Sequence, residues 1–190
     1  TCDLVMAGAL ALNCGATARL CGEGPHERVW VQPAAGDAGT ALGAALWIDA
    51  QQKKSTTRSY RMEHAFLGPA YDDGEIEAFL RWSKLSYRRL NNVAEDAAEI
   101  LAQDKIIGWH QGRMEFGPRA LGGRSILASP IAPDMQARLN EIKDREDFRP
   151  VAPVVLEEEA ANWFVDGQAA PFMLFTFDVR PEKADRIPAV

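Results

Sequence analysis

The sequence predicts an α/β (α+β) protein. Short apolar runs of strand length alternate with longer segments in which apolar residues recur at helical spacing. Turn signals rich in glycine and proline separate the two kinds of segment. The composition, with 47% hydrophobic and 25% charged residues, is that of a folded chain and excludes a disordered or fibrous one. At 190 residues, the chain is long enough for one ordinary domain or for parts of two.

In the first sixty residues, the pattern predicts two strands and two helices in alternation. Residues 4–6 and 29–32 are short apolar runs and are predicted to be strands. A short helix is expected at 16–20. A longer helix is expected at 37–51, after the turn that contains Pro33. The polar and basic stretch 51–61 is predicted to be a linker.

From residue 75 onwards, helices and strands are predicted to keep alternating. Ile76 and Phe79 begin a helical stripe, and Pro133 suits the first position of a helix. The strand predicted at 151–156 contains Pro153 and is placed at a sheet edge, because proline has no backbone N–H to donate to a neighbouring strand. The expected helices are 75–89, 93–101, 133–142 and 157–164, and the expected strands are 105–109, 125–128, 151–156 and 172–179.

Charge and cysteine usage exclude several classes of function. The formal net charge of −6 excludes a general electrostatic attraction to nucleic acid or to an anionic membrane. No apolar run approaches the roughly 20 residues of a membrane span. Three cysteines without a CxxC pair argue against a disulfide framework and a zinc knuckle. Buried free thiols are expected instead, as in a protein of the reducing cytoplasm.

The stretch from Gln111 to Ser125 is the strongest candidate for a ligand site. It carries three arginines and four glycines in fifteen residues. Glycine lets backbone N–H groups approach a ligand closely, and arginine offers planar paired donors to phosphate and carboxylate oxygens. The combination is typical of an anion cradle. The alternative is a solvated surface loop held by salt bridges.

Further cations follow about twenty residues later, at Lys143, Arg145 and Arg149. Lys143 and Arg145 are two residues apart, so they would point to the same side of an extended backbone. The alternative is that these cations only complement the dipole at a helix C-terminus.

A third candidate lies at Gly36-Asp37-Ala38-Gly39, where a helix is expected to begin. Small residues at a helix N-terminus leave room for an anionic ligand. Asp37 is well placed to cap this helix, and a metal-ligand role is the sharper alternative. Asn13 follows an apolar run and could contact a ribose or base, or serve only as a turn residue.

At these residues the chain resembles the NodU/CmcH/TobZ-like O-carbamoyltransferase family. The resemblance covers nearly the whole chain, and the match at the arginine-rich loop is long and contiguous. The matching segments are Asp3 to Leu20, Gln32 to Leu46 within VQPAAGDAGTALGAAL, QGRMEFGPRALGGRSILASP, and KDREDFRPVAPVVLEE.

The resemblance implies two domains. Residues 1–60 would be the C-terminal portion of an ASKHA-like domain that transfers the carbamoyl group. Residues 61–190 would be a YrdC-like domain, truncated at its C-terminus, that forms carbamoyl-adenylate. The chain would then be a fragment of an enzyme that transfers one-carbon groups (EC 2.1.3.-), inactive by itself.

The resemblance also implies co-substrates and residue roles. The enzyme would use ATP, carbamoyl phosphate and a divalent metal (Fe, Mn or Mg), with a small-molecule hydroxyl compound as acceptor. Asp37 would bind the metal. The catalytic cations would be Arg113, Arg119, Lys143 and Arg145. The residues expected to bind nucleotide or co-substrate are Asn13, Gly36, Gly39, Gly112, Gly117, Arg124, Ser125 and Arg149.

Two other functions remain open from the sequence. One is a threonylcarbamoyl-AMP-type synthase or transferase for tRNA modification. The other is a nucleotide-binding module without catalysis. The arginine-rich loop favours the O-carbamoyltransferases over the first, and the acidity of the chain disfavours RNA binding.

Overall fold

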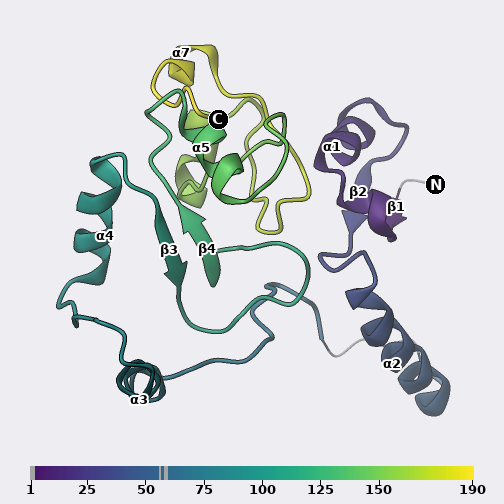
Figure 1. Cartoon of the computed structure of the whole chain (residues 1–190). Helices are drawn as coiled ribbons and strands as arrows, with labels where there is room; N and C mark the ends of the chain where they lie inside the picture. Colours follow the sequence, from purple (N-terminus) through teal and green to yellow (C-terminus); the bar gives the residue numbers. More distant parts are fainter. Residues whose placement is uncertain (1–2, 56, 58–59) are drawn as a thin grey trace. The chain divides into compact units, whose positions relative to one another are not determined.

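The computed structural model describes residues 3–55, 57 and 60–190 (Figure 1). These residues form two compact units, and each unit is assembled from separate stretches of the chain. The first contains Thr1–Gly68, Met114–Leu121 and Ala169–Phe177. The second contains Pro69–Arg113, Gly122–Gln168 and Asp178–Val190. The prediction of domains at 1–60 and 61–190 stays a prediction.

The first unit is built on a parallel pair of strands. β1 (Asp3–Met6) pairs in register with β2 (Arg28–Val31), and η1 (Ala9–Leu12) and α1 (Cys14–Glu23) form the crossover between them. A crossover is required because parallel strands cannot be joined by a tight turn. The core contains Ala11, Val31, Ala35 and Leu174. Leu174 arrives from the far end of the chain, and its carbonyl oxygen accepts a hydrogen bond from the buried Thr17 hydroxyl.

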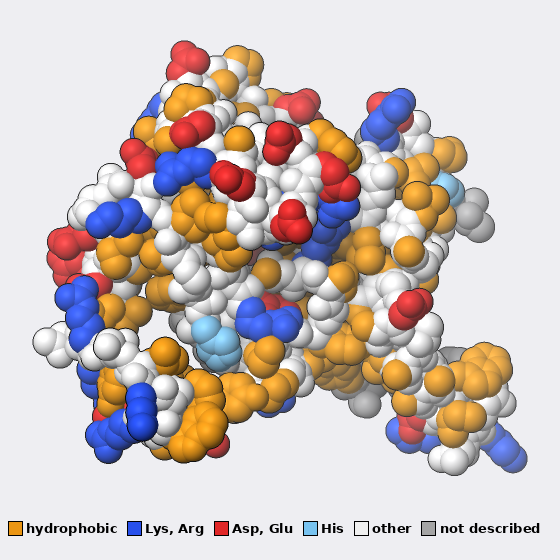
Figure 2. All heavy atoms as spheres, in the orientation of Figure 1, with side chains coloured by type: hydrophobic (Ala, Val, Ile, Leu, Met, Phe, Trp, Pro, Cys, Tyr) orange, Lys and Arg blue, Asp and Glu red, His pale blue; other side chains and the backbone are white. Residues whose placement is uncertain are grey.

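The longest helix of the first unit, α2 (Ala38–Lys53), has no buried residue. Its apolar side chains lie on the surface, where α2 is seen at the lower right of Figure 2. Trp47, for example, is 66% exposed. The helix predicted at 37–51 is confirmed by α2. Its apolar residues contribute nothing to the core of the first unit.

The second unit is built on an antiparallel pair with helices around it. β3 (Ile107–His110) pairs with β4 (Arg124–Leu127). Met135 and Leu139 are buried on one face of α5 and pack with Ala189, while Ile142, at the end of the same helix, is exposed. The helices are α3 (Asp73–Ser83), α4 (Val93–Ala102), α5 (Met135–Ile142), α6 (Ala160–Trp163) and α7 (Pro181–Ala184), with η2 (Glu157–Glu159) before α6.

The helix predicted at 75–89 is six residues shorter at its C-terminal end. A reciprocal capping box starts α3: the Glu75 N–H donates to Asp72 (2.8 Å), and the Asp72 N–H donates to Glu75 (2.9 Å). The helix stops at Lys84, whose left-handed backbone (φ 57°) breaks the repeat. Tyr87 is therefore outside the helix, although its hydroxyl still reaches Glu77.

Two predicted strands, 151–156 and 172–179, are wrong. The first is an irregular segment in which Val154 is 89% exposed, and Pro153 has no N–H to donate to a ladder. The second contributes only the isolated bridge from Val179 to Phe164. Leu174 is buried there without strand pairing, because an apolar run can be buried in irregular backbone as well as in a sheet.

The mixed α/β class is confirmed, since helices and small sheets alternate along the chain. Cys14 and Cys21 are free thiols, as expected, but their predicted burial is wrong, since Cys14 is only partly buried and Cys21 is exposed. Cys2 lies outside the described residues. In the predicted linker 51–61, residues 56, 58 and 59 also lie outside them. Among the described helices, none combines the length and the apolar character needed to cross a membrane.

Candidate functional site

The arginine-rich loop is divided between the two units. Its middle, Met114–Leu121, belongs to the first unit and carries Arg119. Its two ends belong to the second unit and carry Arg113 and Arg124.

In the first unit, Arg119 is anchored to the turn that precedes α1. Its Nη2 donates to the carbonyl oxygen of Leu12 at 2.6 Å. Its Nε is buried and has no hydrogen-bond partner among the described residues. Asn13, which follows Leu12 in the chain, caps α1, because its side-chain oxygen accepts from the N–H of Ala16 at 3.1 Å. Arg119 therefore fixes the backbone from which Asn13 projects.

Glycines let the same loop lie directly against the turn before α2. Gly117 has φ 112°, and a Cβ there would lie 3.2 Å from the carbonyl oxygen of Pro33. Gly39 is more tightly packed: a Cβ would lie 2.0 Å from the carbonyl oxygen of Ala34. A Cβ at Gly36 would lie in ordinary contact distance of the Leu12 side chain. The first unit thus brings together the predicted residues Asn13, Gly36, Gly39, Gly117 and Arg119.

Asp37 does not cap α2 through its side chain, although the sequence predicted this role. It stands directly before α2, but its backbone is already helical (φ −56°, ψ −35°) and its side chain makes no capping hydrogen bond. The capping prediction is therefore wrong, because a cap requires non-helical backbone to aim its oxygen at the first turn. The Asp37 side chain is exposed. No group of three His, Cys, Asp or Glu side chains suited to a metal ion occurs in the described part of the chain.

In the second unit, four predicted residues lie at one end of the β3–β4 pair. β3 ends at His110, which is opposite Arg124, the first residue of β4. The connection tightens at Gly112 (φ 63°), and the N–H of Gly122 donates to Ser125 Oγ at 3.1 Å. The residues gathered at this end are Gly112, Arg113, Arg124 and Ser125.

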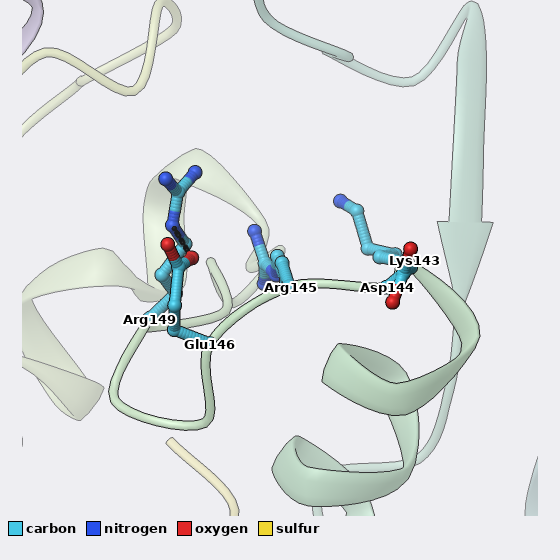
Figure 3. A pocket seen from close by; sticks show the side chains of 5 residues that line it. All are labelled: Lys143, Asp144, Arg145, Glu146 and Arg149. Atoms are coloured by element: carbon cyan, nitrogen blue, oxygen red, sulfur yellow. Dashed lines mark ion pairs between the residues drawn. The ribbon is translucent and has the colours of Figure 1, made fainter.

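The cations at 143–149 surround an open hollow after α5. Figure 3 shows the side chains of Lys143, Arg145 and Arg149 extending to the same side of the loop. The backbone is not extended as predicted, since Asp144 is left-handed (φ 47°). Glu146 pairs with Arg149 at 2.8 Å. The hollow is lined by three cations and two carboxylates, Asp144 and Glu146.

The loop around this hollow is held by a buried amide. Asn140 is fully buried, and its Nδ2 donates to the carbonyl oxygens of Asp147 and Arg149, both at 3.0 Å. Its Oδ1 accepts from Arg145 Nε at 2.6 Å, and Arg145 Nη2 donates to the carbonyl oxygen of Pro150 at 3.2 Å. These bonds set where the Arg145 guanidinium lies.

Two family descriptions match this chain. One, described as Carbamoyltransferase N-terminus, matches residues 1–46, and the other, described as Carbamoyltransferase C-terminus, matches residues 98–190. Together they cover well over half of the sequence. The chain belongs to the carbamoyltransferase family.

Named relatives agree with this membership. Nodulation protein NolNO of Sinorhizobium fredii is 42% identical over 98% of the chain and 28% of its own length. Nodulation protein U of Rhizobium tropici is 40% identical over 99% of the chain and 31% of its own length. An uncharacterized protein of Synechocystis is 45% identical over 95% of the chain and 31% of its own length. The chain spans about a third of the length of the curated relatives it matches.

Two residues of this carbamoyltransferase-family chain were missed by sequence reasoning. Glu115 is 5% exposed, and its Oε1 accepts from the N–H of Leu121 at 2.7 Å, which closes the turn that carries Arg119. Asn140 holds the cationic loop. A carboxylate inside an arginine-rich loop was a visible signal for Glu115. Asn140 had no comparable signal, because an asparagine in a predicted helix usually faces solvent.

The ionisation of Lys143 is coupled to its surroundings. Partial burial, and secondarily the neighbouring charge of Arg145, lower the pKa of Lys143 below its ordinary value. Its positive charge is therefore lost at a lower pH than that of a free lysine. Any anion affinity that depends on Lys143 should fall as the pH rises through this lowered pKa.

Arg145→Gln is expected to move this pH midpoint upward, because the repelling charge is removed while the burial remains. The midpoint can be followed by NMR of the Lys143 side chain over an alkaline pH series. Arg180→Gln is the matched control, since Arg180 bonds to the carbonyl oxygen of Ala161, outside the loop. An unchanged midpoint in Arg145→Gln would contradict the coupling.

Proposed function

We propose that this chain is part of an ATP-dependent O-carbamoyltransferase. Carbamoyl phosphate is cleaved by water to carbamate and phosphate, and a carbamate oxygen then displaces pyrophosphate from the α-phosphorus of ATP. A hydroxyl group of a small-molecule acceptor attacks the carbamoyl carbon, AMP leaves, and the hydroxyl proton passes to a base or to solvent. The acceptor is a sugar, an antibiotic or a related metabolite, and the protein is cytoplasmic.

The observation that carries the proposal is the cationic hollow at 143–149. ATP and carbamoyl phosphate repel one another, so a site that binds both needs cations already held in position. Lys143, Arg145 and Arg149 extend to one side of the loop, and Asn140 fixes Arg145 among them. Such cations would bind phosphate oxygens of the co-substrates.

The first unit supports a second role, binding of the adenylate. The segment that carries Gly117 and Arg119 lies against two turns, one at Leu12 and the other at Pro33 and Ala34, directly before Gly36. Arg119 Nε is a buried donor that lacks a partner among the described residues, which suits an acceptor from a bound ligand. We propose that this part of the unit contacts carbamoyl-adenylate.

A divalent metal would supply Lewis-acid polarisation of the reacting oxygens. Asp37 fits as one carboxylate ligand, because its side chain is exposed and makes no capping bond. The described residues offer no complete group of three ligands around it, so no step is derived through the metal. The catalytic contribution assigned to this chain is the binding and orientation of anions.

The full-length protein tests this function directly. With ATP and carbamoyl phosphate it should release pyrophosphate and form carbamoyl-adenylate. A threonylcarbamoyl-AMP-type synthase would require threonine and bicarbonate instead, and a pure binding module would turn over neither mixture. Pyrophosphate release that depends on threonine and bicarbonate would overturn the proposal.

The 190-residue chain alone is expected not to transfer carbamoyl groups. It spans about a third of its relatives, and the described residues do not contain a complete metal-ligand group. Mass spectrometry of acceptor mixtures incubated with ATP and carbamoyl phosphate would check this. ATP-dependent carbamoylation of an acceptor by the isolated chain would contradict it.

A further inference from the structure

The side chain of Asn140 is fully buried and bonds to the loop that lines the cationic hollow. Asparagine is seldom fully buried, because its amide must then find partners inside the protein. Here it has three, two backbone carbonyls and one guanidinium. The N–H donors and the oxygen of the Asn140 amide are thus engaged within the protein. Asn140 itself is therefore no ligand-binding residue.

The three partners of Asn140 all belong to the loop that forms the hollow. Its amide nitrogen holds the backbone at Asp147 and Arg149, and Gln136 adds a second donor to the Arg149 carbonyl at 3.0 Å. These bonds close residues 145–149 into a ring against α5. The loop contains no helix or strand of its own that could hold it in this shape.

The bond to Arg145 determines the direction of its guanidinium. Nε donates to Asn140 at 2.6 Å and Nη2 donates to Pro150 at 3.2 Å. Two donors on one edge of a planar group fix its plane, so the orientation of this guanidinium, which lines the hollow, is set from within the protein. The short Nε bond is charge-assisted, because the guanidinium is permanently cationic.

We propose that Asn140 is a positioning residue for polyanion binding, which acts by holding Arg145 and the 145–149 loop. The inference rests on the proposed function, since it assumes that the hollow binds phosphate groups. Asn140 lies outside the arginine-rich stretch and is thereby added to the site. The roles of Lys143 and Arg145 also become distinct. Lys143 supplies charge, and Arg145 supplies charge in a direction set by Asn140.

The test measures binding of inorganic pyrophosphate to the 190-residue chain by calorimetry. Asn140→Ala should weaken binding about tenfold, in line with loss of a hydrogen bond to a charged group. Arg145→Ala should weaken it at least as much, and the double variant should bind no more weakly than Arg145→Ala. Asn162→Ala is the matched control, because the Asn162 side chain donates to Glu159 at 2.9 Å and lies outside the loop.

A spectroscopic readout separates positioning from general destabilisation. In chain labelled with ¹⁵N-arginine, the Arg145 Nε–H signal should exchange slowly with water in the wild type and rapidly in Asn140→Ala. The signal should be absent from Arg145→Lys, which assigns it to Arg145. Arg145→Lys is also a second variant in which the buried Asn140 is kept. Because lysine keeps the charge but loses the planar fork, this variant should bind pyrophosphate more weakly than the wild type and more tightly than Arg145→Ala.

The outcomes distinguish the two claims. If the wild-type chain does not bind pyrophosphate, the anion-binding role in the proposed function fails, and the inference falls with it. If the wild type binds and Asn140→Ala binds equally well, only the positioning role is overturned. If Asn140→Ala does not fold, Arg145→Lys decides, and wild-type affinity in that variant overturns the inference.

Discussion

Gly39→Ala is expected to destabilise the first unit by about 3 kcal/mol, at the upper end of the usual cost of overpacking. The added Cβ would lie 2.0 Å from the carbonyl oxygen of Ala34, a backbone atom that cannot move without shifting the buried turn. The gain in helix propensity, about 0.5–1 kcal/mol, is too small to offset this clash. A urea titration combined with hydrogen exchange of residues 31–39 would measure the loss.

Gly43→Ala is the matched control in the same helix. A Cβ at Gly43 would meet open space, so this substitution should stabilise the helix by about 0.5–1 kcal/mol. Opposite signs for the two glycines would establish that close approach of the turn, and not helix propensity, selects Gly39. Equal stabilisation by both would contradict the packing described for the turn before α2.

Arg119→Ala is expected to lower ATP-dependent carbamoyl transfer by the full-length protein roughly 100-fold. A fixed donor to developing or bound negative charge is commonly worth this much. Loss of the bond to Leu12 would also loosen the turn that carries Asn13. The effect therefore combines the loss of the Arg119 donor with a displacement of Asn13. Pyrophosphate release and carbamoylated product, measured together, would quantify it.

Arg28→Ala controls for removal of an arginine from the same unit. Arg28 forms an exposed pair with Asp3 across β1 and β2, and exposed pairs contribute little to stability. It should keep activity within about twofold of the wild type. Activity of Arg119→Ala at the level of this control would remove Arg119 from the site.

Short-range patterns predicted much of the local structure. The helix predicted at 93–101 is observed as α4, Val93–Ala102, and β3 and β4 occur close to their predicted positions. These features depend on neighbours within a few residues, so they can be read from the chain. The 172–179 strand could not be judged this way, because whether an apolar run pairs as a strand depends on distant partners.

The candidate site was predicted as a set of residues and not as an arrangement. Glycine and arginine in one short stretch indicated an anion site, but Arg119 belongs to the first unit and Arg113 to the second. The burial of Glu115 and Asn140 was not predicted from the sequence either.

By itself, the sequence determined the α/β class, the family and the chemical character of the candidate site, because these follow from residue types and their order. The tertiary structure alone decided that Leu174 completes the core of the first unit and that Asn140 orients Arg145. The physical reason is that burial and hydrogen bonding are pairwise properties. They depend on which backbone carbonyl or side chain lies opposite, and the linear order of residues does not specify that.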